Sequence, residues 1–305
     1  MNKTTDKTIA GFLFAIIAGL LWGISGNCGD ILFKQYGISV EYLVTWRLII
    51  TGVLMLSVLL VRKRPLFLIW CNKKDSAVLA GFAILGMIGV QYFFFLTIRH
   101  SNAATATVIQ YIAPIFIVIW TAFRSKKLPH PFESIGVLLA FFGIYLFATG
   151  GNFHSLTISG TALIFGIISV FGLAFYMLLP VGIVAKYGTS VVVGWGMLLA
   201  GLVMLLLTRF PNSGIRWDLR ALLLYLFLIV FGTLIPFTLF IKSIQLIGAA
   251  KAGILSCMEP FSSVIVSVVW LGQSFAAADY LGFACIIFAV TLISVLDLVK
   301  EKNHR

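Results

Sequence analysis

Charged residues are scarce in this sequence, and no polar stretch is long enough to form a soluble domain. Only 10% of the 305 residues are charged, whereas 61% are hydrophobic. Such a chain has more apolar surface than a soluble domain of this size can bury, which excludes an ordinary soluble fold. We therefore expect an integral membrane protein.

The residues that usually build metal centres and catalytic clusters are also few. The four cysteines show no spacing typical of a disulfide framework or a metal site, and the four histidines fall in expected loops or near the C-terminus. The sequence contains no Gly-rich loop ending in Gly-Lys-Ser or Gly-Lys-Thr, which excludes a built-in ATPase of that type. We expect no enzyme, no cofactor and no metal site.

Ten apolar stretches are long enough to cross a bilayer. About 20 residues, at a rise of about 1.5 Å per residue, cover the roughly 30 Å of hydrocarbon. The first stretch is too long for the core of a signal peptide, so it is kept as a helix. The predicted fold is all-α, with ten transmembrane helices over residues 9–33, 40–61, 77–99, 102–123, 131–149, 158–184, 190–208, 220–244, 247–270 and 277–298.

The second half of the chain repeats the first. Residues 101–146 align with residues 247–292 at a constant offset of 146, which pairs Ala103 with Ala249 and Pro114 with Pro260. Because five crossings is an odd number, the second copy enters the bilayer from the opposite side. This predicts two inverted-topology repeats, over residues 1–150 and 151–305, an architecture typical of secondary transporters.

Basic residues are distributed unevenly between the two ends of the expected helices. With the N-terminus in the cytoplasm, the inner segments carry 16 Lys and Arg residues and the outer segments carry 5. The positive-inside rule therefore places both termini in the cytoplasm of a plasma-membrane protein. The net charge of +12 follows from basic residues that face anionic lipid, and their dispersion among helix ends disfavours a nucleic-acid partner.

Glu259 is the strongest candidate for a functional residue, since a carboxylate in a membrane span is costly. It lies near the middle of the ninth expected helix, directly before Pro260. Because proline has no N–H to donate to the carbonyl four residues back, Ser256 should present a free acceptor about one turn away. This arrangement is typical of a site for a small cation or an amine. The alternative is a protonated or paired carboxylate that holds helices together.

The fourth expected helix has the corresponding feature in the first repeat. It reads Gln110-Tyr111-Ile112-Ala113-Pro114, so Pro114 leaves the carbonyl of Gln110 without its usual donor. Two helices are therefore expected to break at symmetry-related depths. Broken helices near the midplane are where transporters of this plan bind substrate.

Arg47, seven residues into the second expected helix, is the other buried charge. It could pair with Asp30 or Glu41 near the outer face, pair with Glu259, or hold a substrate carboxylate. A structural ion pair is the favoured interpretation. Further candidates that offer polar or aromatic surface inside the spans are Trp22, Asn27, Gln91, Tyr176 and Trp195.

Three features together are similar to those of one transporter family. They are Leu21-Trp22-Gly23 in the first expected helix, Trp46-Arg47-Leu48 in the second, and in each half a helix with a late proline followed by a glycine-containing fifth helix. Over its whole length the chain resembles the drug/metabolite transporter superfamily, EamA type.

The resemblance implies export of small metabolites such as amino acids, driven by exchange or a proton gradient. It places Trp22, Arg47, Gln110 and Glu259 in or beside a central cavity formed mainly by helices 1 to 4 and 6 to 9. The chain departs from a frequent pattern at Gln273, because the loop before the last helix often carries an acidic residue there.

The function we expect is secondary transport by alternating access around a midplane cavity, with export of amino acids or related polar or aromatic metabolites. Glu259 is the candidate proton carrier, since surrounding hydrocarbon favours a neutral carboxyl unless a cation pairs with it. A non-transporting membrane sensor and an uptake permease of the same fold are the alternatives. The expected partners are a small-molecule substrate, the lipid bilayer and protons, in a monomer or weak dimer.

Overall fold

The computed structural model describes residues 3–126, 131–150, 158–212, 214, 217–247, 252, 255–256 and 258–303. All regular secondary structure in this part of the chain is helical, as the sequence predicts for an all-α membrane protein. Six helices are long and apolar enough to cross a membrane: Lys7–Lys34, Val40–Val61, Lys73–His100, Gly160–Leu178, Thr189–Leu207 and Leu219–Ile247.

The remaining four expected spans also contain apolar helices. Their described apolar parts are Ala103–Ile117, Ser134–Gly143, Met258–Val269 and Ala277–Ala289, and the fifth and tenth expected spans lie in helices of 19 and 27 residues, Pro131–Thr149 and Ala277–Asn303. The fourth and ninth expected spans shorten where the chain approaches Pro114 and Pro260, because proline fits the first turn of a helix better than its interior.

The first half of the chain contains nine helical elements in the described residues. They are α1 (Lys3–Lys34), α2 (Val40–Val61), the 3-10 helix η1 (Leu68–Cys71), α3 (Lys73–Gly81), the π-helix η2 (Phe82–Ile88), α4 (Gly89–His100), α5 (Ala103–Gln110), α6 (Ala113–Ser125) and α7 (Pro131–Thr149).

The second half follows a similar order. Its described elements are α8 (Gly160–Leu178), α9 (Val181–Tyr187), α10 (Thr189–Leu207), α11 (Leu219–Ile229), the π-helix η3 (Val230–Leu234), α12 (Ile235–Ile247), α14 (Met258–Val269) and α15 (Ala277–Asn303).

Polar residues fix where several of these helices begin. Ser39, Asn102, Ser159 and Asp218 each accept a hydrogen bond from a backbone N–H in the first turn of the helix that follows. Such N-caps satisfy donors that would otherwise lack a partner at a helix start. Asp218 illustrates the geometry, since its carboxylate lies 2.7 Å from the amide nitrogen of Ala221.

The two π-helical segments occupy matching positions in the repeats. Shifting residues 82–88 of η2 by the offset of 146 gives residues 228–234, which contain all of η3. The equivalent glycines Gly86 and Gly232 lie in these segments and face the first helix of the opposite half. A Cβ on Gly86 would lie 3.1 Å from the Cα of Tyr176, and a Cβ on Gly232 would lie 2.5 Å from the Cβ of Ser25.

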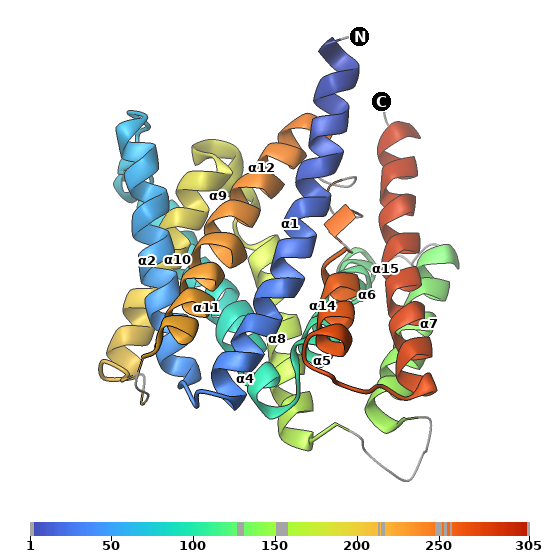
Figure 1. The fold of residues 1–305 in the computed structure, drawn as a ribbon. Coiled ribbons are helices and arrows are strands. Elements are labelled where there is room, and N and C mark those ends of the chain that lie inside the picture. The colour runs from blue at the N-terminus through green and yellow to red at the C-terminus, as the bar shows by residue number, and fades with distance from the viewer. Residues whose placement is uncertain are drawn as a thin grey trace.

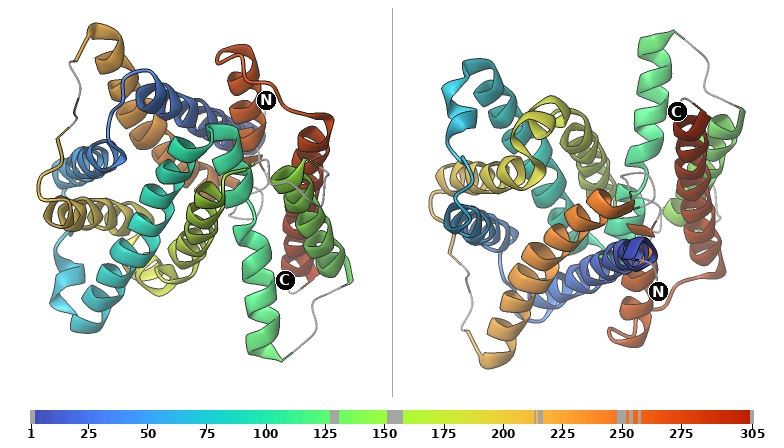
Figure 2. Two further views of the ribbon diagram at one scale, coloured as in Figure 1. Left: turned by 90° about the horizontal axis from the view of Figure 1, so that it is seen from below. Right: turned by 90° about the horizontal axis from the view of Figure 1, so that it is seen from above.

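Helices from the two halves are interleaved. The most extensive contacts pair α2 with α10, α4 with α8, α1 with both α12 and α14, and α7 with α15. Figure 1 shows the α7–α15 pair at one side of the bundle, and both views in Figure 2 show it set apart from most other helices. The two termini lie at the same end of the molecule (Figure 1), as an even number of crossings requires.

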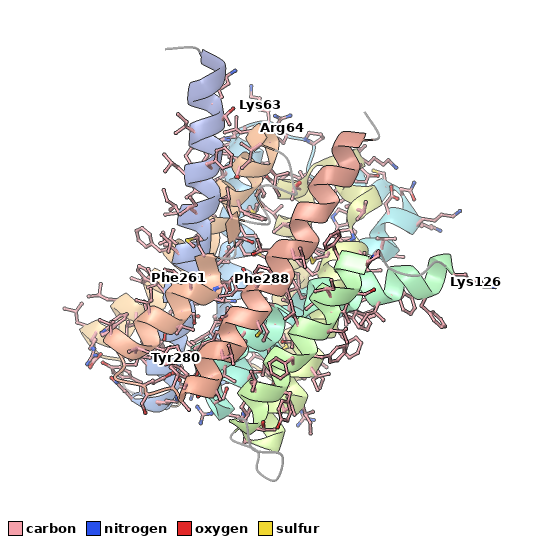
Figure 3. The ribbon with its side chains drawn as sticks, turned by 90° about the vertical axis from the view of Figure 1, so that its right-hand side faces the viewer. Lys63, Arg64, Lys126, Phe261, Tyr280 and Phe288 are labelled. Carbon is pink, nitrogen blue, oxygen red and sulfur yellow. The ribbon has the colours of Figure 1, made fainter. Side chains whose placement is uncertain are left out.

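Large apolar side chains cover the outer surface, as a bilayer requires. Phe261 in α14 and Tyr280 and Phe288 in α15 are about half exposed and point outward in Figure 3. Lys63 and Arg64 lie at the end of the bundle that carries the N-terminus (Figure 3). The described helices thus present apolar flanks between ends that carry charge.

Candidate functional site

The fourth and ninth expected helices are both interrupted close to their prolines. In the first half, α5 ends at Gln110, the chain turns at Tyr111 and Ile112, and α6 begins at Ala113, so that Pro114 is its second residue. In the second half, α14 begins at Met258, which places Glu259 in its first turn. Glu259 therefore lies at a helix N-terminus, where the helix dipole favours negative charge, and not in mid-helix as the sequence suggests.

Tyr111 connects these two interruptions. Its hydroxyl donates to the carbonyl oxygen of Ser256 over 2.7 Å and, at a longer distance of 3.3 Å, to Oε2 of Glu259. Pro260 leaves this Ser256 carbonyl without its usual helical donor, so the hydroxyl occupies an acceptor that the sequence predicts to be free. Three of the candidate residues thus form one cluster, hereafter the Tyr111–Glu259 cluster, which joins the first half to the second.

Helix α1 packs closely against this cluster through Gly19 and Gly23. A Cβ on Gly19 would lie 3.0 Å from the Ser256 carbonyl oxygen, and a Cβ on Gly23 would lie 2.5 Å from the Glu259 carbonyl oxygen. Two glycines one turn apart let helix backbones approach within a membrane. Ser262 strengthens the contact by donating to the carbonyls of Glu259 and of Leu20 in α1.

Asn27 holds α1 to α14 one turn further along. Its amide nitrogen donates to the carbonyls of Gly23 and Ser263, and its amide oxygen accepts a 2.7 Å hydrogen bond from the hydroxyl of Ser267. The side chain is fully buried. Because its hydrogen-bonding atoms are already used within the protein, Asn27 acts in this conformation as a link between helices.

Arg47 lies in a second polar group and has no ion pair among the described residues. One of its guanidinium nitrogens donates to Oε1 of Gln91, and its guanidinium carbon lies 4.5 Å from the centre of the Phe95 ring. Only 3% of Arg47 is exposed, and its Nε has no hydrogen-bond partner among the described residues. A buried guanidinium without an acidic partner is costly unless another group compensates it.

The ion pair that we expected for Arg47 is therefore wrong for this conformation. The ion pairs among the described residues are Lys34 with Asp30 and Lys186 with Asp75. Glu41 instead accepts a 2.7 Å hydrogen bond from the hydroxyl of Tyr92. Asp30 and Glu41 therefore bind other partners. The hydrogen-bond acceptor of the Arg47 guanidinium is the neutral side chain of Gln91.

The environment of Asp30 explains why glutamine, and not the frequent acidic residue, stands at position 273. Its amide nitrogen donates to Oδ2 of Asp30 over 3.0 Å, and Lys34 binds the same carboxylate at 2.9 Å through Oδ1. Asp30 is almost fully buried. An acidic residue at position 273 would repel Asp30 here, whereas an amide donates to it.

Trp22 and Gln110 bind other parts of the bundle. Trp22 makes edge-to-face contacts with Phe237 and Phe240 of α12, with ring centres 5.2 and 5.3 Å apart. Gln110 donates to the carbonyl of Val90 in α4 over 3.3 Å. Trp22 lies on α1, which packs against the Tyr111–Glu259 cluster, and Gln110 is the last residue of α5, directly before Tyr111. Among the described residues, neither side chain forms a hydrogen bond with Glu259.

Tyr176 and Trp195 also contact other parts of the bundle. Tyr176 packs on Phe82 in the π-helix η2, at 5.4 Å between ring centres. Trp195 donates through Nε1 to the carbonyl of Leu66 and packs on Trp70. Trp195 therefore anchors the connection between α2 and α3.

A polar contact that the sequence does not reveal joins the halves near the ends of α3 and α9. Lys186 and the hydroxyl of Tyr187 both donate to Oδ2 of Asp75, over 2.6 and 2.7 Å. The hydrogen bond to Asp75 raises the pKa of the Lys186 ammonium above its ordinary value, so this cation stays charged at physiological pH. The sequence gives no periodic signal for such a pair, because its partners are more than 100 residues apart.

Replacing Tyr111 by Phe tests the link between the two interruptions. We expect the variant to lose about 0.5–1.5 kcal/mol of stability, the usual net contribution of one hydrogen bond. The measurement is the thermal unfolding midpoint of the purified protein in detergent. Tyr280→Phe is the matched control, since Tyr280 is half exposed, and equal midpoints for the two variants would show that the Tyr111 hydroxyl contributes nothing.

Together, the interleaved halves, the interrupted helices and the intramembrane carboxylate define a two-repeat membrane transporter. Comparison with known proteins identifies the family, since residues 9–149 and residues 160–295 each match the EamA-like transporter family. The chain belongs to this family, whose relatives here are transporters of the drug/metabolite type.

Individual relatives agree with this assignment. The chain is 40% identical over 294 residues to the uncharacterized inner membrane transporter YicL of Salmonella typhimurium, which covers 95% of this chain and 96% of the relative. It is 24% identical to the threonine/homoserine exporter RhtA of the same species, over 71% of this chain and 70% of the relative. A crystal structure at 18% identity shares the fold, with a TM-score of 0.62 over 96% of this chain and 97% of that one.

Proposed function

We propose that this protein is a secondary transporter that exports small polar metabolites, with amino acids as the first substrates to test. The Tyr111–Glu259 cluster is the observation that carries the proposal. It places a carboxylate and a backbone carbonyl of the second half on a hydroxyl of the first, at helix interruptions of both. A substrate amine that binds Glu259 and the Ser256 carbonyl would replace the Tyr111 hydroxyl and so break this hydrogen-bonded link between the two halves.

The proposal includes the finer architecture expected from the sequence. The two units, residues 1–150 and 151–305, each supply five crossings, with both termini in the cytoplasm of the plasma membrane. Alternating access then moves one unit against the other around the Tyr111–Glu259 cluster. Protons are the proposed coupling ion, with Glu259 as their carrier, and a monomer contains one complete pathway.

Amino acids are proposed because the two polar groups have complementary chemistry. Glu259 and the Ser256 carbonyl suit an ammonium group, whereas Arg47 is a buried cation without an acidic partner in the part of the chain that the structure describes. A substrate carboxylate would take the place of Gln91 on the guanidinium and compensate its charge. The relative RhtA, named a threonine/homoserine exporter, supports this substrate class.

The first experiment is metabolite profiling inside and outside cells that overproduce the wild-type protein or an equally expressed Glu259→Ala variant. The expected result is at least one amino acid that is depleted inside and enriched outside only with the wild type. The reverse distribution would identify an uptake permease. If purified protein in liposomes also moved none of the amino acids that the cells contain, export of amino acids would be excluded.

Arg47→Lys tests the role of the guanidinium in binding a carboxylate. Lysine keeps the charge but loses the paired donors, so we expect a loss of about 1.5–3 kcal/mol in substrate binding. This corresponds to about a 10- to 150-fold higher half-saturating concentration for amino acids. Substrate amides without the carboxylate should be affected much less.

Arg99→Lys is the control for this substitution. Arg99 also donates to a protein acceptor, the Ile38 carbonyl at 3.0 Å, but at the exposed end of α4. We expect its half-saturating concentration to match the wild type. Equal losses for amino acids and their amides in Arg47→Lys would show that the guanidinium does not bind a carboxylate.

A further inference from the structure

A cavity of about 510 Å³ lies on the flank of the bundle, separate from the Tyr111–Glu259 cluster. Helix α1 contributes Ile24 and Cys28, helix α11 contributes one face from Leu219 to Phe227, and Trp270 closes the end beyond α14. Its size falls in the range of roughly 300–1,000 Å³ that holds small ligands in proteins. We call it the α1–α11 groove.

The groove faces the region that lipid occupies. Leu219 and Leu223 on its α11 wall are 72% and 56% exposed, and Trp270 is 50% exposed. Cys28, by contrast, is almost fully buried and forms part of the inner wall. An apolar groove with an exposed outer edge in a membrane-spanning helix is therefore open to acyl chains from the side.

One end of the groove is basic. Arg220 is the second residue of α11, which begins at the end of the molecule away from the two termini (Figure 1). Among the described residues its guanidinium has no ion pair or hydrogen bond, whereas the neighbouring Asp218 is occupied as the N-cap of α11. A free guanidinium at the bilayer surface beside an apolar groove complements a lipid phosphate.

We propose that the α1–α11 groove binds one anionic phospholipid from the leaflet on the side away from the termini. The phosphate binds Arg220, and one acyl chain follows α11 inward to Phe227. The path from Arg220 to Phe227 is about 10 Å long at the helical rise of about 1.5 Å per residue, which fits within one leaflet of the roughly 30 Å hydrocarbon core. Trp270 packs beside the chain near the headgroup, as interfacial tryptophans do.

The lipid would contact the same two turns of α1 that hold α14. Ile24 and Cys28 in the groove directly follow Gly23 and Asn27, which pack on α14. A bound lipid therefore packs on a face of α1 adjacent to the one that packs on α14, since consecutive residues of a helix point about 100° apart. The binding test below does not depend on transport, so it can fail or succeed independently of the proposed function.

Native mass spectrometry of the purified protein with added phosphatidylglycerol tests this site. The wild type is expected to retain one phosphatidylglycerol molecule in preference to phosphatidylcholine. Arg220→Gln, which removes the cation, and Leu223→Trp, which fills the groove at an exposed position, should each weaken that binding at least tenfold. Sn-glycerol 3-phosphate alone should not compete, since it lacks the acyl chain.

Arg209→Gln is the matched control, because Arg209 is exposed in the turn after α10 and is not part of the groove. It removes the same charge and should leave phosphatidylglycerol binding unchanged. Thermal unfolding in detergent checks that each variant is folded, and Leu223→Trp keeps the test valid if Arg220→Gln is unstable. Wild-type retention by folded Leu223→Trp, or equal retention of phosphatidylcholine, would overturn the proposal.

Discussion

Export by the Glu259→Gln variant is expected to fall at least about tenfold and to lose its dependence on a pH gradient. Glutamine keeps the shape of the side chain and can still contact the Tyr111 hydroxyl, but it can neither carry a proton nor bind an amine as an ion pair. Loss of one charge-assisted contact costs about 1.5–3 kcal/mol, which is about 10- to 150-fold in affinity. The measurement is uptake of labelled amino acid into inverted vesicles with and without an imposed proton gradient.

Asp279→Asn is the control for the removal of one carboxylate. Asp279 caps the start of α15 by accepting a hydrogen bond from the Ala276 amide over 2.8 Å, and asparagine can do the same. We expect wild-type transport from this variant. Full dependence on the pH gradient in Glu259→Gln would exclude Glu259 as the proton carrier.

Gly23→Ala is expected to produce the largest loss of stability, about 1–3 kcal/mol from overpacking. The added Cβ would lie 2.5 Å from the carbonyl oxygen of Glu259 and 2.7 Å from the amide nitrogen of Ser263. These are backbone atoms, so α1 and α14 must separate to make room. The measurement is the thermal unfolding midpoint in detergent, together with amino-acid export, which should fall because Glu259 moves with α14.

Gly81→Ala provides the contrast. Gly81 is also helical, but a Cβ there would meet no atom within 4 Å. Alanine at that position should leave the midpoint unchanged or raise it, since alanine favours a helix over glycine by about 1 kcal/mol. If both variants had the same midpoint, the close approach at Gly23 would not limit stability.

The sequence predicts the chemistry of the cluster better than its geometry. Pro260 points to Ser256 because proline, which has no N–H, cannot donate to the carbonyl four residues back. The group that binds the carbonyl is Tyr111, 145 residues away, and no local pattern indicates which hydroxyl will arrive there. The same limit explains Arg47, whose neighbours depend on how α2 packs against α4.

The helix lengths show a second limit of predicting structure from the sequence. Hydropathy locates apolar stretches but does not register that a chain turns inside one, as at Tyr111 and Ile112. Hydropathy also does not predict the π-helical segments, because a π turn needs no change in composition. The offset of 146 pairs Pro114 with Pro260 and Gly86 with Gly232, so it marks equivalent positions in the two halves but does not predict a π turn at either.

The paired π-helices also have a consequence for the direction of transport. Each is a local widening of the helix that can bend, and each faces the leading helix of the opposite half through a glycine, Gly86 or Gly232. Exchanging the bend of one segment for that of the other would give an arrangement related to the present one by a pseudo-two-fold rotation about an axis in the membrane plane. For the secondary transport proposed above, the same pair of segments would then serve both arrangements, and the solute and ion gradients would set the direction in which cargo flows.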